Sequence, residues 1–412
     1  MLKASIKPPV KLLFNATFIA HVIDIKHGSR SGIFWVIFNL FKQFIKDERF
    51  DVTLFLRDNK KRNIFDNLLD FKNCKFVCDF YPASKNGKFF AVKNPNFKVT
   101  GYDAYFRGDF LGDIYDSAEI LPRFDFLHDT IPLLTDYNKN SSVEFYRFYK
   151  NVLTKNSYCF CVSQSCRNDF LRFFPVLDEN KMVVVPIATA NKLYPDKDEN
   201  KIKEVLKKYG FKHEANRKYL FTLCTLGDPR KQIFFQIKCF LKFIKKCKID
   251  DLYFYLGGGN HEKRKDVSTY LKNHLEDLYD EDKIRILGYV EDEDVNILYT
   301  NSLFFTYISL YEGFGMPPLE AMSAGVPVVT GNNSSLPEVV GDAAIMVDAR
   351  DENAIIQAYE AFYFNPGLRK EYIEKGLERA KMFSWEKTYK IISDKMLEVL
   401  NVNSDSATLI RN

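Results

Sequence analysis

The chain has 412 residues, of which 46% are hydrophobic and 27% are charged, so it can bury the cores of two domains of ordinary size. Its formal net charge is +5, spread over interleaved acidic and basic residues. This composition excludes a disordered chain and a strongly basic nucleic-acid-binding protein, although it is compatible with a weak attraction to anionic lipid. The longest apolar run, residues 32–41, is shorter than the roughly 20 residues that a membrane span needs.

The eight cysteines lack the paired spacing of a zinc site. Neither Cys74 with Cys78 nor Cys159 with Cys161 and Cys166 is joined by a histidine or a second C-x-x-C. We therefore expect buried free thiols and a reducing, cytoplasmic location. The apolar stretch near the N-terminus is interrupted by polar residues, so it predicts a strand and a loop rather than a secretory signal.

Strand-like and helical runs alternate along the chain. In the first half we expect strands at residues 11–18, 52–56, 124–128, 158–162 and 181–187. Helices are expected at residues 32–46, after a capping box from Ser141 to Glu144, and after Ser163. In the second half we expect strands at residues 219–225, 252–256, 284–287, 303–308, 326–330 and 344–347, and a last helix at 385–400.

This alternation predicts an α/β protein made of two doubly wound, mainly parallel sheets that face a cleft. We place the first domain at residues 1–190 and the second at residues 191–385. Residues 386–412 would hold the last helix and a frayed tail. The polar segment 188–217, around Pro195, is expected to connect the domains.

The stretch 309–343 holds the densest group of chemically useful residues. Glu312 and Glu320 flank a run of glycines and prolines. Because proline is tolerated in the first turn of a helix and is costly further in, the pair Pro317-Pro318 predicts that a helix begins there and that Glu312 lies on the preceding loop. Glu320 would lie in or just after the first turn, and Gly325 would end the helix in a left-handed cap.

The loop before this helix is suited to an anion. Gly313 and Gly315 permit positive φ and a close approach to the backbone, and the N-terminus of a helix carries a partial positive charge. Gly313, Phe314 and Gly315 would receive a diphosphate, while Glu312 and Glu320 would accept hydrogen bonds from ribose or sugar hydroxyls. A nucleotide sugar has both parts. The alternative is that the glycines merely form a turn and the glutamates a solvated face.

These residues resemble glycosyltransferase family 4, whose mark is a glutamate, seven residues and a second glutamate. The pattern E-G-F-G-x-P-x-L-E-A-M-x-x-G-x-P-V is matched almost completely across residues 312–328, and L-P-E-V-V-G-D-A follows at residues 336–343. The resemblance implies the GT-B fold of two Rossmann-like domains, with a last helix that crosses back to the first. It also implies retaining transfer from a nucleotide diphosphate sugar, with Glu312 on the sugar hydroxyls and Glu320 on the ribose.

Two cations follow the first strand of the second domain. Arg230 and Lys231 come after Gly227-Asp228-Pro229, and ligands gather at the carboxyl ends of strands in open parallel sheets. Alone they would be interpreted as a solvated turn. Family 4 enzymes, however, carry a similar P-R-K-N run that binds the donor phosphates, with Gln232 replacing the asparagine here. We therefore assign Arg230 and Lys231 to the donor diphosphate, because these residue types are the usual phosphate partners.

His128 ends another predicted strand and opens the run His128-Asp129-Thr130-Ile131-Pro132. A lone histidine is more often structural. This run, however, resembles the H-D-x-I-P-L element of mannosyltransferase-like family members, which implies that His128 lies near the donor sugar and the acceptor. Asp129 would either orient the ring of His128 or cap the loop.

Two further glycine runs follow strands. The segment Gly28-Ser29-Arg30-Ser31-Gly32 would admit an anion or the acceptor, although it lacks the third glycine of a dinucleotide fingerprint. It resembles the first glycine loop of the family, in which Gly32 would take part. The arginine that often follows this loop is absent, so the acceptor phosphate contact stays open. Gly257-Gly258-Gly259 is predicted to form a turn beside the nucleotide.

Aromatic residues make up 15% of the chain. One set recurs at helical spacing, which is typical of a core rather than of a membrane-binding face: Phe34, Trp35, Phe38, Phe41 and Phe44. Tyr105 with Arg107, and Tyr146 with Arg147, are both candidates to meet a sugar acceptor. The acidic run Asp292-Glu293-Asp294 spells D-x-D, but it precedes a predicted helix, where a capping role is expected.

The residues and the resemblance together indicate a metal-independent transferase that moves a hexose to a hydroxyl of a glycan or lipid-linked glycan, and the resemblance implies that the transfer is retaining. Such a reaction serves bacterial surface polysaccharide or lipopolysaccharide assembly, at the cytoplasmic side, with peripheral membrane contact left open. Arg230, Lys231 and the helix dipole at Gly315 would neutralise the diphosphate, so neither a metal nor a further cofactor is expected. GDP-mannose is the first donor, because both family runs recur in mannosyltransferases, and a UDP-hexose is the second.

Two rival functions use the same fold. A nucleotide-sugar epimerase would bind the same donor but would isomerise it without an acceptor. A binding protein with a dead site would have lost a glutamate or the Arg230-Lys231 pair, and both are present. The transferase interpretation is therefore preferred.

Overall fold

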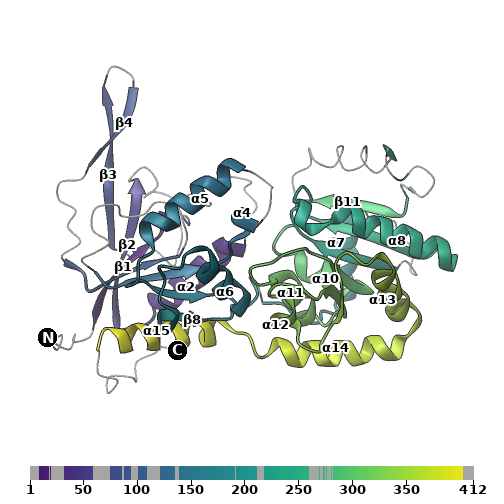
Figure 1. The fold of residues 1–412 in the computed structure, drawn as a ribbon. Coiled ribbons are helices and arrows are strands. Elements are labelled where there is room, and N and C mark those ends of the chain that lie inside the picture. The colour runs from purple at the N-terminus through teal and green to yellow at the C-terminus, as the bar shows by residue number, and fades with distance from the viewer. Residues whose placement is uncertain are drawn as a thin grey trace. The chain divides into compact units, whose positions relative to one another are not determined.

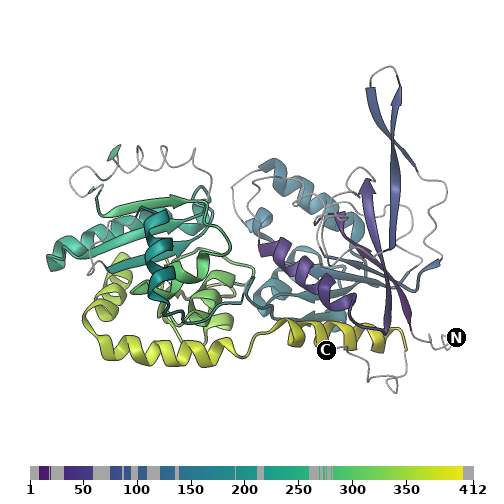
Figure 2. The same ribbon diagram turned by 180° about the vertical axis from the view of Figure 1, so that it is seen from behind.

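The computed structural model describes residues 9–17, 19, 32–58, 75–85, 88–93, 101–108, 121–134, 139–190, 192–210, 218–258, 269, 272–273, 275, 280 and 282–401, with backbone alone for 56–58, 76–85, 88–93 and 139–141. The chain forms two compact units. Unit 1 comprises Met1–Ile187 and Ser384–Asn412, and unit 2 comprises Ala188–Phe383. The breaks fall shortly before the predicted ones at residues 190 and 385. Figures 1 and 2 show the ribbon from opposite sides.

Unit 1 is built on an eight-stranded sheet with the order β4-β3-β2-β1-β5-β6-β7-β8. Its strands are β1 (Val10–Asn15), β2 (Phe50–Asp58), β3 (Lys75–Lys85), β4 (Lys88–Lys93), β5 (Ala104–Arg107), β6 (Arg123–Leu127), β7 (Tyr158–Cys161) and β8 (Met182–Val184). Its helices are α2 (Gly32–Phe44), α4 (Ile131–Leu134), α5 (Lys139–Val152), α6 (Gln164–Phe173), the 3-10 helix η4 (Glu179–Lys181) and α15 (Trp385–Val399). The strands pair in parallel, apart from the antiparallel β3–β4 hairpin, which extends beyond the rest of the sheet in Figures 1 and 2.

Aromatic side chains at helical spacing hold α2 against the sheet, as the sequence predicts. Phe34, Phe41 and Phe44 are buried. The ring of Phe14 on β1 lies 5.5 Å from that of Phe41 and 5.8 Å from that of Phe44. Burial of such rings removes large apolar areas from water, so this set forms the core of unit 1.

The last helix completes that core. Tyr389 of α15 packs its ring edge-on against Phe44 at 4.9 Å, and its hydroxyl donates to Asp47 at 2.7 Å. The hydroxyl of Thr388 donates to the carbonyl of Pro186 at 2.7 Å. The C-terminal helix is therefore an integral part of unit 1.

Unit 2 is built on a six-stranded parallel sheet with the order β11-β10-β9-β12-β13-β14. Its strands are β9 (Lys218–Leu223), β10 (Leu252–Gly257), β11 (Ile284–Gly288), β12 (Phe304–Tyr307), β13 (Val328–Gly331) and β14 (Ile345–Val347). Its helices are α7 (Glu199–Lys208), the 3-10 helix η5 (Pro229–Lys231), α8 (Ile233–Cys247), α10 (Val295–Thr300), α11 (Met316–Ser323), α12 (Leu336–Val340), α13 (Glu352–Phe364) and α14 (Pro366–Ala380).

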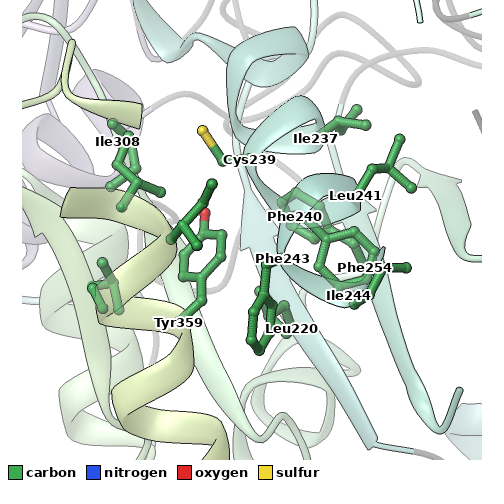
Figure 3. Packing of buried hydrophobic residues seen from close by; sticks show 14 of the residues in the cluster. Leu220, Ile237, Cys239, Phe240, Leu241, Phe243, Ile244, Phe254, Ile308 and Tyr359 are labelled. Carbon is green, nitrogen blue, oxygen red and sulfur yellow. The ribbon is translucent and has the colours of Figure 1, made fainter. Parts of the chain in front are cut away.

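The main core of unit 2 lies between the sheet and the helices α8 and α13. Phe240 and Phe243 of α8, Phe254 of β10 and Tyr359 of α13 are fully buried there, as Figure 3 shows. The ring centroids of Phe240 and Phe254 lie 5.5 Å apart. This layer fixes β9 and β12 side by side, and those two strands carry the candidate site described below.

Two predictions about helix starts have different outcomes. Ser163 caps α6, because its hydroxyl accepts from the N–H of Cys166 at 3.0 Å. The capping box at Ser141 is wrong, since α5 already begins at Lys139 and Ser141 lies inside the helix. The hydroxyl of Ser142 donates instead to the carbonyl of Pro132, so tertiary contacts decide where this helix begins.

The segment expected to connect the domains is partly structured within unit 2. The N–H of Tyr194 donates to Asn296 at 3.0 Å, and α7 follows. Gly325, which ends α11 with a φ of 73°, has no room for a side chain because a Cβ there would lie 2.9 Å from Pro195. The left-handed cap predicted at Gly325 is therefore present, and it also permits this close packing.

The six cysteines that the structure describes are free thiols, and four of them are buried: Cys159, Cys161, Cys166 and Cys239. Cys74 and Cys78 lie outside the side chains that are described. Among the described helices, none combines the length and apolar character needed to cross a membrane.

Candidate functional site

The candidate site of unit 2 lies where the strand order of its sheet reverses. From β9 the chain proceeds to β10 and β11 on one side, and β12, on the other side of β9, is followed by β13 and β14. In open α/β sheets, ligands bind at the carboxyl ends of the strands at such a switch point. The loop after β9 carries Arg230 and Lys231, and the loop after β12 carries Glu312, so the topology brings these three residues together.

The loop after β9 is shaped by a short 3-10 turn, η5. Asp228 caps the turn by accepting from the N–H of Arg230 at 3.0 Å, and Pro229 supplies the fixed φ of a first helical position. Gln232 follows with a left-handed φ of 47°, which asparagine adopts more readily than glutamine. The amide of Gln232 compensates by donating to the carbonyl of Ala349 at 2.7 Å.

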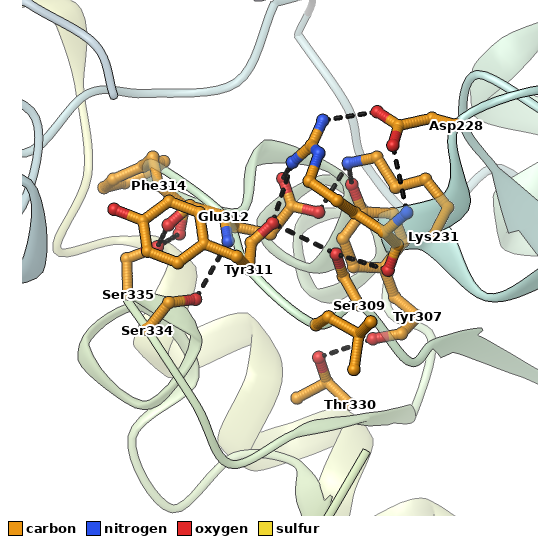
Figure 4. A network of polar contacts seen from close by, with 12 residues as sticks. Asp228, Lys231, Tyr307, Ser309, Tyr311, Glu312, Phe314, Thr330, Ser334 and Ser335 are labelled. Carbon is orange, nitrogen blue, oxygen red and sulfur yellow. Dashed lines mark hydrogen bonds and ion pairs between the residues drawn. The ribbon is translucent and has the colours of Figure 1, made fainter. Parts of the chain in front are cut away.

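Figure 4 shows a compact network of charges at the ends of these loops. Lys231 donates to Glu312 at 2.5 Å and to the hydroxyl of Tyr307 at 2.5 Å. Arg230 pairs with Asp228, lies 4.0 Å from a carboxylate oxygen of Glu312 and donates to the carbonyl of Tyr311 at 2.8 Å. Two cations are thus matched by two carboxylates.

These charges are largely removed from water. The side chains of Lys231 and Glu312 are each 10% exposed, and that of Arg230 is 13% exposed. Ion pairs gain strength as the surrounding dielectric constant falls, although each charge is also costly to desolvate without a partner. An arriving anion would therefore compete with Glu312 and Asp228 for the same N–H donors.

The loop that carries Glu312 is held by the serines after β13. The hydroxyl of Ser334 accepts from the N–H of Glu312 at 2.9 Å, while Ser335 donates to the carbonyls of Glu312 and Phe314 at 2.9 and 2.7 Å. Ser334 has a φ of 49°, a conformation that is uncommon outside glycine. Glu312 is therefore held in a fixed position by its backbone as well as by its carboxylate.

The two glycines of the loop differ in conformation. Gly315 precedes α11 with a φ of 106°, as predicted, whereas Gly313 does not have a positive φ. Phe314 between them is buried, and its ring packs edge-on against Phe383 at 5.8 Å. A ligand at this loop would therefore meet backbone groups rather than the side chain of Phe314.

Helix α11 begins at Met316, one residue before the predicted proline pair. Pro317 and Pro318 lack N–H groups, so two of the donors that a helix N-terminus normally offers do not exist here. The helix dipole remains, but direct contacts to an anion would come from the cations after β9 and from the backbone of the glycine loop.

Glu320 lies in the middle of α11 and is buried. It accepts from the hydroxyl of Tyr299 at 3.0 Å. Burial raises the pKa of Glu320 to about 7, against the lowering effects of the hydrogen bonds from Tyr299 and the backbone of Ala190. Near neutral pH this carboxyl is therefore divided between its two protonation states, and hydroxyl donors of a ligand would favour the ionised one.

His128 lies at the carboxyl end of β6 in unit 1. Its Nε2 donates to the carbonyl of Gly108 at 2.6 Å, and because a carbonyl oxygen can only accept, the neutral ring carries its proton on Nε2 and leaves Nδ1 as an acceptor. Burial lowers the pKa of His128 to about 4, so the ring is neutral at ordinary pH. Asp129 accepts from the N–H of Ile131 at 2.9 Å, so it caps the loop.

The remaining predicted residues belong to the glycine runs and to the acidic run before α10. Gly32 is the exposed first residue of α2, and Gly28 to Ser31 lie outside the described residues, as does Gly259. Gly258 has a φ of 105° at the turn after β10.

Asp294 stands at the N-terminal cap position of α10 without a capping bond from its side chain. It accepts instead from Lys208 at 2.6 Å and from Tyr209 at 2.9 Å, so the expected capping role is wrong for its carboxylate.

The structure separates the two candidate acceptor pairs. Tyr105 and Arg107 are buried in unit 1, where Arg107 pairs with Asp125 at 2.8 Å, so this pair cannot meet an acceptor. Tyr146 and Arg147 are exposed on α5. That exposure keeps the second pair available, but no contact in the structure gives it a role.

Sequence reasoning missed several members of the network. Asp228 had a usable signal, because an aspartate before a proline favours a turn. Tyr307 had none, since it ends a strand of four buried residues that the pattern marks as core. Ser334 and Ser335 lie in a polar loop whose partner cannot be identified without the fold.

Comparison with known proteins bears on the family and the fold of this chain. Residues 207–379 match the family described as glycosyl transferases group 1. The chain is 35% identical over 225 residues to O-antigen chain mannosyltransferase B of Escherichia coli, covering 55% of this chain and 56% of that protein. It is 25% identical over 292 residues to the serotype-specific mannosyltransferase WbdA of Escherichia coli, covering 68% of this chain and 34% of that protein. The chain thus spans little more than half of the first relative and a third of the second.

Among solved structures, the chain is similar to Anabaena Alr3699/HepE in complex with UDP and glucose, with a TM-score of 0.69 and 15% identity, covering 94% of this chain and 100% of that one. At this identity the likeness concerns the fold. The predicted α/β fold of the GT-B type is confirmed, and the match of residues 207–379 confirms the resemblance carried by the pattern from Glu312 to Val328.

Proposed function

We propose that this chain, whose residues 207–379 belong to the glycosyl transferases group 1, is a retaining transferase that moves a hexose from a nucleotide diphosphate sugar to a glycan hydroxyl. The O-antigen and serotype-specific names of the relatives support a role in bacterial surface polysaccharide assembly. Mannose is the favoured hexose, because both relatives are named as mannosyltransferases.

One observation carries the proposal. Arg230 and Lys231 meet Glu312 at the switch point of the sheet, within 4.0 and 2.5 Å. Arginine and lysine are suited to a diphosphate, while a carboxylate accepts from sugar hydroxyls and cannot bind phosphate itself. A site with cations on one loop and a carboxylate on the next therefore fits a ligand that joins a diphosphate to a sugar.

Each residue has a distinct part in the proposed reaction. Arg230 and Lys231 would take up the negative charge that develops on the diphosphate as its bond to the sugar breaks. Glu312 would orient the sugar and favour the positive charge at its anomeric carbon, where the acceptor hydroxyl attacks on the face from which the diphosphate leaves. The acceptor oxygen would bond to that carbon as the bond to the diphosphate breaks, and the hydroxyl proton would pass to the departing diphosphate. Glu320 would accept from the ribose hydroxyls.

His128 is a further residue in the proposal. Its neutral ring offers Nδ1 as an acceptor, which suits a hydroxyl of the donor sugar or of the acceptor. The reaction is proposed to proceed without a metal, since Arg230 and Lys231 can neutralise the leaving diphosphate. No separate cofactor takes part, because the nucleotide sugar is a substrate.

The donor base is the first question for experiment. GDP-mannose, GDP, UDP-glucose and UDP should be compared by the shift in thermal unfolding and by calorimetry, since one structural neighbour is described in complex with UDP and glucose. We expect the guanine nucleotides to bind more tightly. If the UDP ligands bind more tightly, the donor is a UDP-hexose instead of GDP-mannose. If none of the four ligands binds, the proposal is refuted.

The same donor separates transfer from isomerisation. An epimerase would change the configuration of the sugar when the enzyme and donor are incubated alone. A transferase would leave the sugar unchanged and would release nucleotide at an appreciable rate when an acceptor glycan is added. Epimerised donor in the absence of acceptor would therefore contradict the transferase function.

A further inference from the structure

Tyr307 contributes a buried hydroxyl to the charge network. It is the last residue of β12 and is 3% exposed. Its oxygen accepts from Lys231 at 2.5 Å, and its O–H is also directed to the carboxylate of Glu312. Because Lys231 donates to Glu312 as well, the three side chains form a closed ring of hydrogen bonds.

A phenol is well suited to this position because it can accept one hydrogen bond and donate another at the same time. An ammonium has three N–H bonds, and Lys231 donates two of them to Tyr307 and Glu312, which leaves one for an approaching anion. Neither a phenylalanine nor an aliphatic residue could hold both members of the ion pair. The hydroxyl therefore fixes Lys231 and Glu312 in position relative to each other.

We propose that Tyr307 is a positioning residue for the donor, which holds Lys231 toward the diphosphate and Glu312 toward the sugar. This inference rests on the proposed function. The groups that face the phenol are Lys231, Glu312, Arg230 and the thiol of Cys224. Burial and the charge of Glu312 raise the pKa of Tyr307 above its ordinary value, so the phenol stays protonated and acts as a donor rather than a base.

The substitution Tyr307→Phe removes the hydroxyl and leaves the ring in the core. We expect the dissociation constant for the nucleoside diphosphate to rise about ten-fold, the size of one hydrogen bond to a charged group. Transfer should also slow, because Glu312 loses a donor and shifts its contact with Lys231. Calorimetry with GDP and UDP measures the first effect without any acceptor.

A matched control lies on the opposite face of the same strand. The hydroxyl of Tyr359 contacts that of Thr306, the neighbour of Tyr307, at 2.9 Å, and both tyrosines are buried. Tyr359→Phe therefore removes a buried hydroxyl from the same unit, on the other face of the sheet, without touching an ion pair. We expect similar losses of thermal stability in the two variants, and unchanged nucleotide affinity in the control alone.

A double-mutant cycle with Glu312→Gln distinguishes positioning from a general structural effect. If Tyr307 acts through the Lys231–Glu312 pair, Tyr307→Phe should weaken nucleotide binding less when Glu312→Gln is already present. The fold-change in the dissociation constant of the double variant should then differ by more than about two-fold from the product of the fold-changes of the two single variants. Independent effects would multiply, and that result would overturn the inference.

A second variant covers the case in which Tyr307→Phe does not fold. Difluorotyrosine at position 307 keeps the shape but ionises at a lower pH, and a phenolate cannot donate to Glu312. We expect nucleotide affinity to fall in this protein over the pH range in which its phenol ionises, followed by ultraviolet absorbance, and an affinity that stays constant through that ionisation would overturn the inference. A parent that binds no nucleotide would refute the proposed function, whereas normal binding by Tyr307→Phe would refute the positioning role alone.

Discussion

Removal of the charge of Glu312 should have opposite effects on nucleotide binding and on transfer. Glu312→Gln keeps the size of the side chain and some of its hydrogen bonds, but it leaves Lys231 and Arg230 without their shared carboxylate. The site then carries one more net positive charge. A bound diphosphate would be attracted more strongly, whereas the sugar would lose the group that favours positive charge at its anomeric carbon.

The size of the first effect follows from the distances. Glu312 lies 2.5 Å from Lys231 and 4.0 Å from Arg230. A phosphate oxygen on the same ammonium would lie on the order of 5 Å from the carboxylate, where unit charges repel by about 3 kcal/mol at an effective dielectric constant of about 20. Relaxation and residual hydration reduce this value, so we expect binding to tighten by about 1–2 kcal/mol, or about five- to thirty-fold.

Two assays measure the two effects separately. Calorimetry with the nucleoside diphosphate should show the tighter binding, and initial rates with donor and acceptor should show transfer slowed by about ten-fold to a thousand-fold. Glu352→Gln is the matched control, since Glu352 also pairs with two lysines, Lys238 and Lys242, at 2.7 and 2.5 Å. Unchanged or weaker nucleotide binding by Glu312→Gln, together with transfer at the parent rate, would refute the reasoning.

Three further predictions concern the donor site. Arg230→Ala should weaken nucleotide binding by about 1.5–3 kcal/mol. Arg230→Lys should recover a part of this loss, because lysine keeps the charge but not the planar group that contacts Asp228 and Tyr311. If calorimetry gives Arg230→Ala and the parent the same affinity, the phosphates bind elsewhere. Burial raises the pKa of Glu320 to about 7 in the folded state. The protonated carboxyl therefore favours folding at pH values below its pKa in the unfolded chain, and this contribution to stability is lost as the pH rises through 7. Glu320→Gln should therefore gain thermal stability relative to the parent at pH 8, by up to about 3 kcal/mol, and show no gain at pH 4.5. Transfer should continue in EDTA, and complete loss restored by magnesium or manganese would contradict metal independence.

The strands of both sheets were largely predictable from the sequence. Each of the six strands expected in the second half lies within three residues of an observed one, because a buried parallel strand is a short apolar run bounded by turns. In the first half, β5 and the β3–β4 hairpin were missed. For the hairpin, Asn86-Gly87 between two apolar runs is a strong signal.

The pairing within the site was not predictable in the same way. The pattern places Glu312 on a loop before a helix, which the structure bears out. It could not indicate that Glu312 binds Lys231, because the two residues are 81 positions apart and meet through the order of the strands. Strand order depends on which helices cover which face of the sheet. It is therefore set by the packing of the whole unit and cannot be inferred from a short stretch of sequence.

In the proposed reaction, the contact between Lys231 and Glu312 would couple recognition of the phosphates to recognition of the sugar. A free nucleoside diphosphate would draw Lys231 and Arg230 away from Glu312. The nearly buried carboxylate of Glu312 would then lie unpaired beside the negative charge of the diphosphate, which is costly. A nucleotide sugar would instead supply hydroxyls that donate to Glu312 once the cations have turned to the phosphates. The same carboxylate would therefore favour the intact donor and weaken the hold on the nucleotide that remains after transfer. Glu312 would then contribute to product release as well as to the proposed chemical step, which is why its replacement by glutamine should tighten nucleotide binding and slow transfer together.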